Sequence, residues 1–109
     1  MNFNVKSIAV FERQAKRLIK KYPSLKEELL TLILKLKDTP EQGKALGNHC
    51  FKIRIAIASK GKGKSGGGRV ITNFAVTINT VYLLSIYDKS EKENLTDREL
   101  DELLQFIPE

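Results

Sequence analysis

The 109-residue sequence contains few of the residues that hold metals or cross-link secreted proteins. It has one cysteine, one histidine and no tryptophan. A lone cysteine excludes an internal disulfide, and one cysteine with one histidine is too small a set for a zinc site. The chain also lacks an apolar run near the roughly 20 residues of a membrane span, and its beginning lacks the apolar stretch of a signal peptide. These absences predict a soluble cytoplasmic protein that uses no metal, no other cofactor and no membrane.

Acidic residues are missing from the middle of the chain. Residues 42–87 carry seven bases and no acid, whereas residues 1–41 carry nine bases and five acids, and residues 88–109 carry three bases and eight acids. The middle therefore contributes +7 to a chain whose net charge is +6. A stretch of this length without a carboxylate favours a surface that binds phosphates. The alternative is ordinary solubilising charge.

Apolar periodicity predicts one α+β domain over residues 1–109. Spacings of three and four indicate helices over 8–22 and 25–36, which a three-residue turn joins into an antiparallel hairpin. Strict alternation indicates strands. We expect the order β-α-α-β-β-β-α, in which a small and mainly antiparallel sheet packs against the N-terminal helical hairpin. The expected strands lie near 3–5 and over 51–57, 69–76 and 81–87, and a last helix lies between Thr96 and Pro108.

Two capping boxes mark expected helix starts. Ser24 with Glu27, and Thr96 with Glu99, have the spacing in which a hydroxyl accepts a hydrogen bond from an early helix amide while the carboxylate returns one to the cap.

Basic side chains gather on one face of the predicted sheet. Lys52 and Arg54 are two residues apart on one strand, so they point the same way, and Arg69 begins the neighbouring strand. The loop over 59–68 that joins these strands holds five glycines and three lysines: Lys60, Lys62 and Lys64. Its glycines allow close approach of the backbone to a ligand, and its lysines can reach phosphates. This pattern predicts a phosphodiester site, whereas a plain flexible connection is the alternative for the loop.

Two other candidate sites are weaker. Gly63-Lys64-Ser65 resembles the end of a phosphate-binding P-loop, but Ala58 stands where that motif needs glycine, and a strand follows instead of a helix. His49 is a possible general base, although a solvated loop histidine is the commoner situation.

Three segments together resemble a known family. They are Phe51-Lys-Ile-Arg-Ile-Ala, the stretch Ser-Lys-Gly-Lys-Gly-Lys-Ser-Gly-Gly-Gly-Arg-Val-Ile, and Tyr82-Leu-Leu-Ser-Ile-Tyr-Asp-Lys-Ser-Glu. This arrangement resembles bacterial RelE/ParE-type toxins, and most of all the HigB-like branch that carries an Ala-Ser-Lys-Gly-Lys-Gly-Lys loop. The resemblance covers nearly the whole chain, with the helical hairpin as its least specific part.

The resemblance implies a small sheet packed on two helices, a cognate antitoxin encoded by a neighbouring gene, and ribosome-dependent cleavage of mRNA. Lys52 and Arg54 match a basic pair of RelE-like toxins, and Arg69 matches an arginine at a strand start. Lys89 matches a basic residue after the last strand. Ser90 replaces an arginine of the RelE pattern, and no tyrosine stands near 94–96. Tyr87 or Asp88 would take those places.

The chemistry implied by the resemblance needs no metal, because the RNA's own 2′-OH attacks the adjacent phosphate. Such a site needs cations that stabilise the transition state, and groups that move two protons. Arginines stabilise but stay charged, whereas a lysine crowded by cations can have a lowered pKa and transfer a proton. Asp88 is either a base or an ion-pair partner.

The expected function is that of a type II toxin that cleaves translated mRNA, with catalytic candidates Arg54, Arg69, Lys89, Tyr87 and Asp88, and RNA- or ribosome-binding candidates Lys52, Lys60, Lys62 and Lys64. The alternatives are a ParE-like toxin that inhibits gyrase and an RNA-binding domain without catalysis.

Overall fold

The fold comes from a computed structural model that describes residues 2–60 and 66–108. Five strands form one mixed sheet in the order β1-β5-β4-β3-β2. Strand β1 pairs parallel to β5, and every other neighbouring pair is antiparallel. The elements are β1 (Asn4–Ser7), α1 (Ala9–Lys21), α2 (Leu25–Asp38), β2 (Lys44–Gly47), β3 (Cys50–Ile55), η1 (Ala58–Lys60), β4 (Gly68–Ala75), η3 (Val76–Ile78), β5 (Thr80–Asp88) and α3 (Asp97–Leu104).

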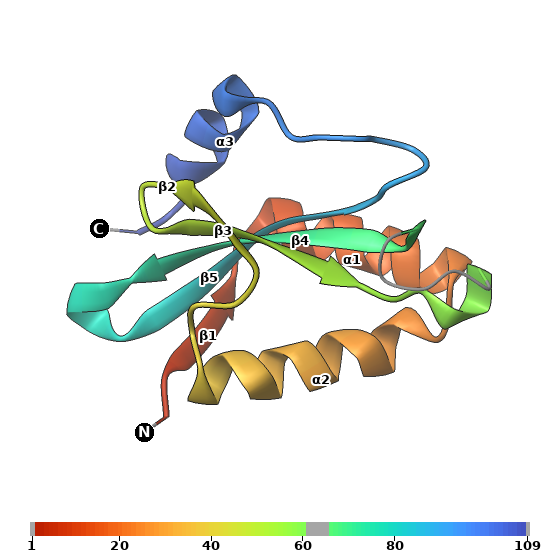
Figure 1. The fold of residues 1–109 in the computed structure, drawn as a ribbon, viewed down its shortest axis with the longest axis horizontal. Coiled ribbons are helices and arrows are strands. Elements are labelled where there is room, and N and C mark those ends of the chain that lie inside the picture. The colour runs from red at the N-terminus through yellow and green to blue at the C-terminus, as the bar shows by residue number, and fades with distance from the viewer. Residues whose placement is uncertain (1, 61–65, 109) are drawn as a thin grey trace.

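The helices lie on different sides of the sheet. In Figure 1, α1 and α2 run in opposite directions as a hairpin, and α2 and α3 lie on opposite sides of the strands. Each helix buries one stripe, for example Leu18 on α1 and Leu36 on α2, both fully buried. Strand β5 is buried along its whole length, because it lies between β1 and β4 and is covered on both faces. The α+β class and the helical hairpin are therefore confirmed.

The sheet has one strand more than the periodicity indicated. Strand β2 is four residues long and exposed throughout, so it shows no alternation of apolar and polar residues. A two-residue turn joins it to β3, in which Asn48 and His49 both have positive φ, at 53° and 59°. His49 is thus an exposed turn residue.

One of the two expected capping boxes is absent. Thr96 accepts a hydrogen bond from the Glu99 amide, and Glu99 accepts one from the Thr96 amide, as expected. Ser24, in contrast, has helical backbone angles and makes no cap. Its hydroxyl is used elsewhere, in a contact with Ser59 described below, so the prediction for Ser24 was wrong.

Among the described residues, no helix has both the length and the apolar character that crossing a membrane requires.

Candidate functional site

Three neighbouring strands present Arg54, Arg69 and Tyr87 as one row across the sheet. Arg54 on β3 lies opposite Arg69 on β4, and Arg69 lies opposite Tyr87 on β5. Residues directly opposite each other on paired strands point to the same face of a sheet. The three side chains therefore leave the same face, which is the face opposite to the one that Ile53 and Ile55 bury.

A second basic pair lies beside this row. Lys52 is two residues before Arg54 and lies opposite Lys44 on β2. Lys89 follows β5 and continues its ladder, because its amide donates to the Gly67 carbonyl at 3.0 Å. Lys89 is two residues after Tyr87 in this ladder, so the Lys89 side chain leaves the same face of the sheet as Tyr87. We call these five residues the cation cluster: Lys44, Lys52, Arg54, Arg69 and Lys89.

The members of the cation cluster are held to different degrees. Arg69 is only 5% exposed, and its Nη1 donates to the Gly68 carbonyl at 2.9 Å. Arg54 and Lys89 are exposed. The cluster therefore combines a guanidinium fixed at the base of the site with cations that reach solvent.

Electrostatics show that the cluster is compact. The pKa of Lys52 is lowered from its ordinary value of 10.5, first by partial burial and then by the charges of Lys44, Arg69, Arg54 and Lys89. Burial and nearby like charges both disfavour the ammonium form. A bound phosphate would relieve this repulsion, so the cluster is suited to holding an anion.

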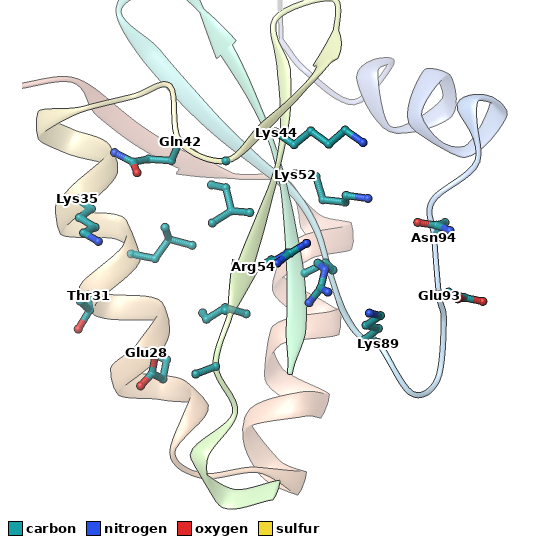
Figure 2. A pocket seen from close by; sticks show the side chains of 16 residues that line it. Glu28, Thr31, Lys35, Gln42, Lys44, Lys52, Arg54, Lys89, Glu93 and Asn94 are labelled. Atoms are coloured by element: carbon teal, nitrogen blue, oxygen red, sulfur yellow. The ribbon is translucent and has the colours of Figure 1, made fainter. Parts of the chain in front are cut away.

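A pocket of about 660 Å³ opens over the cluster and continues around the edge of β3 (Figure 2). The pairing of β3 with β2 ends at Lys52, which leaves this edge open toward α2. Helix α2 supplies Glu28, Thr31 and Lys35 to the far wall, and the chain after β5 supplies Glu93 and Asn94. Figure 2 shows Lys52 and Arg54 of the cluster between these two walls.

Tyr87 lies in the row but under a cover. It is 5% exposed, and its hydroxyl has no hydrogen-bond partner of good geometry among the described residues. Burial raises its pKa, while Arg69, Lys92 and the nearby backbone amide of Leu95 act in the opposite direction. Burial thus favours the protonated hydroxyl and limits its access to a ligand.

Asp88 points to the other face of the sheet. Its neighbours Tyr87 and Lys89 face the cluster, so alternation turns Asp88 toward the helices, where it is fully buried. Its Oδ2 accepts from the Tyr22 hydroxyl at 3.1 Å, and its Oδ1 accepts from both the amide and the hydroxyl of Ser90. Among the described candidates, this carboxylate lies on the face of the sheet opposite to Arg54, Arg69, Tyr87 and Lys89.

The glycine-lysine loop falls largely outside the described residues. Lys62, Lys64 and the side chain of Lys60 are not described, so their expected role stays a prediction. The start of the loop is placed by two serines. The Ser59 amide donates to Ser24 Oγ at 2.9 Å, the Ser24 amide donates to Ser59 Oγ at 3.1 Å, and the two hydroxyls bond at 2.7 Å.

Lys44 was missed by the sequence reasoning, because the short strand that carries it gave no alternating pattern. Its position in the stretch without acids was the available signal. Within the described ranges, no group of three or more His, Cys, Asp and Glu residues lies close enough to hold a metal ion.

Comparisons with known proteins agree with the geometry. A family model described as the RelE toxin of the RelE/RelB toxin-antitoxin system matches residues 6–107. Among solved structures, the chain is similar to a free-state, double arginine-to-alanine mutant of the E. coli toxin RelE, with a TM-score of 0.64 and 19% identity. That match covers 99% of this chain and all of the other, and it establishes the shared fold. The chain belongs to the RelE family of toxins of toxin-antitoxin systems.

Proposed function

We propose that this protein is a toxin whose residues 1–109 act as one domain that cleaves translated mRNA at the ribosome, without a metal ion, in the manner of the HigB-like branch. The observation that carries the proposal is the row of Arg54 and Arg69 opposite each other, with Lys52 and Lys89 beside it. Two opposed guanidinium groups suit a phosphate that gains charge during reaction, because each can donate two hydrogen bonds to it.

The proposed reaction uses the RNA 2′-OH as the nucleophile. Its oxygen attacks the adjacent phosphorus and loses its proton, and the 5′-oxygen of the next nucleotide leaves and gains a proton. The products are a 2′,3′-cyclic phosphate and a 5′-hydroxyl. Arg69 and Arg54 stabilise the five-coordinate transition state, Arg69 from its fixed position and Arg54 from the solvent side.

The proton steps are assigned to lysines of the cluster. Lys52 is the best candidate for the base, because its lowered pKa increases the neutral fraction that can accept a proton. Lys89 is the exposed cation at the opposite end of the row, and it protonates the leaving oxygen. Tyr87 supports Arg69 from the adjacent strand, and Asp88 is left out of the proton steps because it faces the helices.

Binding of the substrate extends beyond the cluster. The lysines at 60, 62 and 64 follow directly from the pinned Ser59, so we propose that they contact the RNA or ribosome backbone. The same positive face suits an acidic segment of a cognate antitoxin of the RelB type, because complementary fields speed association and favour the right partner.

The test is cleavage of mRNA on purified translating ribosomes. A requirement of cleavage for a divalent metal ion is tested by titrating Mg²⁺ and by replacing it with cobalt hexammine. We expect new RNA ends that carry 5′-hydroxyls, and we expect the Arg54→Gln/Arg69→Gln double variant to produce none. The Arg13→Gln variant, which removes one exposed charge from α1, is the control. Ends that carry 5′-phosphates would contradict attack by the 2′-OH. Arrest of DNA replication before translation after induction in cells would favour the gyrase-inhibiting alternative.

A further inference from the structure

The buried carboxylate of Asp88 sits at the exact point where β5 ends and the chain reverses. It accepts hydrogen bonds from Tyr22 at the end of α1 and from Ser90 in the turn. The backbone carbonyl of the same residue accepts from the amides of Glu91 and Lys92, both at 3.0 Å. Asp88 therefore organises the reversal of the chain in two ways. Its carboxylate bonds Tyr22 and Ser90, and its backbone carbonyl accepts from the next residues of the turn.

The reversal is also fastened from outside. Glu91, the residue after Ser90, bonds Arg17 at 2.7 Å and Lys21 at 3.4 Å, both on α1. These contacts hold the turn against the end of the helix that also carries Tyr22. The turn is thus tied to the helical layer at its carboxylate and at its outer side chain.

Lys89 is the residue that this arrangement places. It lies between Asp88 and Ser90, its amide is bonded to Gly67, and its side chain points to the face opposite to that of Asp88. Figure 2 shows it in the wall of the pocket, on the side of the chain that follows β5. The other cations of the cluster repel an ammonium group, and a lysine on a loose strand end would move away from them. A fixed strand end opposes that movement.

We infer that Asp88 is a positioning residue: it fixes the strand end from which Lys89 reaches the cation cluster. What Lys89 then does to RNA rests on the proposed function, whereas the placement itself does not. A role for Asp88 as the general base is a different assignment, and it conflicts with a carboxylate on the far face of the sheet, because a base must come within hydrogen-bond reach of the proton it takes.

The placement is tested without any activity, by hydrogen exchange. In Asp88→Asn, the amides of Lys89, Glu91 and Lys92 should exchange about 10-fold faster or more, while the amides of β3 keep their rates. Tyr22→Phe removes one donor and leaves the carboxylate in place, so it should shift the same amides by less. Asp38→Asn, which removes an exposed carboxylate at the end of α2, is the control and should change nothing near residue 89. Unchanged exchange at these three amides, or an equal increase in β3, would overturn the inference.

The link to function is tested by a double-mutant cycle of Asp88→Asn and Lys89→Ala in single-turnover cleavage on the ribosome. Each single variant should slow cleavage by about 10-fold, and Asp88→Asn should slow the Lys89→Ala enzyme by no more than about 2-fold, because residues that act through one group are not additive. The pH dependence of Asp88→Asn should keep the wild-type shape. Multiplicative losses, or a lost limb of the pH profile, would show that Asp88 acts by itself and would overturn the inference. If the wild-type protein cleaves nothing, the proposed function fails, and the exchange experiment still decides the placement.

Discussion

Arg54 and Arg69 lie directly opposite each other on β3 and β4, so two permanently charged groups form a cross-strand pair of like sign. Such pairs weaken a sheet, whereas opposite charges at the same positions strengthen it. The site thus reduces the stability of the sheet that carries it, as strained or repulsive functional sites commonly do.

Replacement of Arg54 should separate stability from activity. Arg54→Gln removes the repulsion and should raise the free energy of unfolding by up to about 1 kcal/mol. The same change should slow cleavage about 100-fold or more, because it removes a charged donor from the transition state. Chemical denaturation and single-turnover cleavage measure the two effects. Full activity would remove Arg54 from the site, and lower stability would contradict the repulsion.

Because of Lys52, the protein should be more stable at alkaline pH than at neutral pH. Its pKa is lowered in the folded protein, so the unfolded chain binds more protons between that lowered value and the ordinary 10.5. Stability therefore rises with pH across this window, because deprotonation relieves the repulsion. Lys52→Met should be more stable than wild type at pH 7, and the difference should shrink as the pH rises. Thermal unfolding from pH 7 to 10.5 tests this, with the exposed Lys16→Met as the control.

Glu99 should contribute stability that acid removes. Its pKa is lowered to about 2, first by the hydrogen bond from Lys92 and then by the Thr96 amide. The unfolded value is near 4.5, so the contribution is complete above that pH and is lost as the pH falls toward 2. Glu99→Gln should melt below wild type at pH 7, and the two curves should converge near pH 2. Glu102→Gln, which loses only an exposed pair with Arg98, should show a much smaller difference.

Gln14 should stabilise the end of β5 that β1 does not cover. Strand β1 pairs only with residues 80–83, and Gln14 Oε1 accepts from the Ile86 amide and the Ser85 hydroxyl, both at 3.0 Å. Gln14→Leu leaves these donors without an acceptor and should lower the free energy of unfolding by about 1–3 kcal/mol. Gln14→Glu keeps the acceptor and should lose less. Equal losses in urea denaturation would show that packing, not the hydrogen bonds, is what Gln14 supplies.

Gly43 should tolerate substitution by alanine far less than Gly47. Both have positive φ, at 85° and 90°, but a Cβ on Gly43 would clash with the Lys52 carbonyl, whereas one on Gly47 would meet nothing. Gly47→Ala should cost about 1–2 kcal/mol for backbone conformation alone. Gly43→Ala should cost more, and it should also slow cleavage by displacing Lys52. Similar unfolding free energies for the two variants would contradict this close approach.

The sequence predicted those helices and strands in which apolar residues recur at a regular spacing. Regular spacing located the three helices and the strands that carry Lys52, Arg54 and Arg69, and alternation placed Lys52 and Arg54 on one face. Alternation also separates Asp88 from Tyr87 and Lys89, and that conclusion was within reach once β5 was extended to its last residue.

The remaining features depend on contacts between distant segments. Ser24 has the local pattern of a cap, but its hydroxyl bonds Ser59, 35 residues away. The cover over Tyr87 depends on an irregular segment before α3, in which Lys92 forms an ion pair with Glu99 of α3. Neither contact is marked by a regular spacing of residues along the chain, so the periodicity of the sequence could not predict it.

The pairing of β1 with β5 also bears on how the toxin is made. The first strand has its partner at residues 80–83, 76 residues later in the chain. At a synthesis rate of about 5–20 residues per second, β1 waits about 4–15 s on the ribosome before its partner exists. Arg54 and Arg69 are translated within that interval, but β4 lacks its β5 neighbour throughout it. A nascent chain therefore passes through a period in which the cation cluster is not yet assembled, because Lys89 follows β5 and β5 is the partner of both β1 and β4.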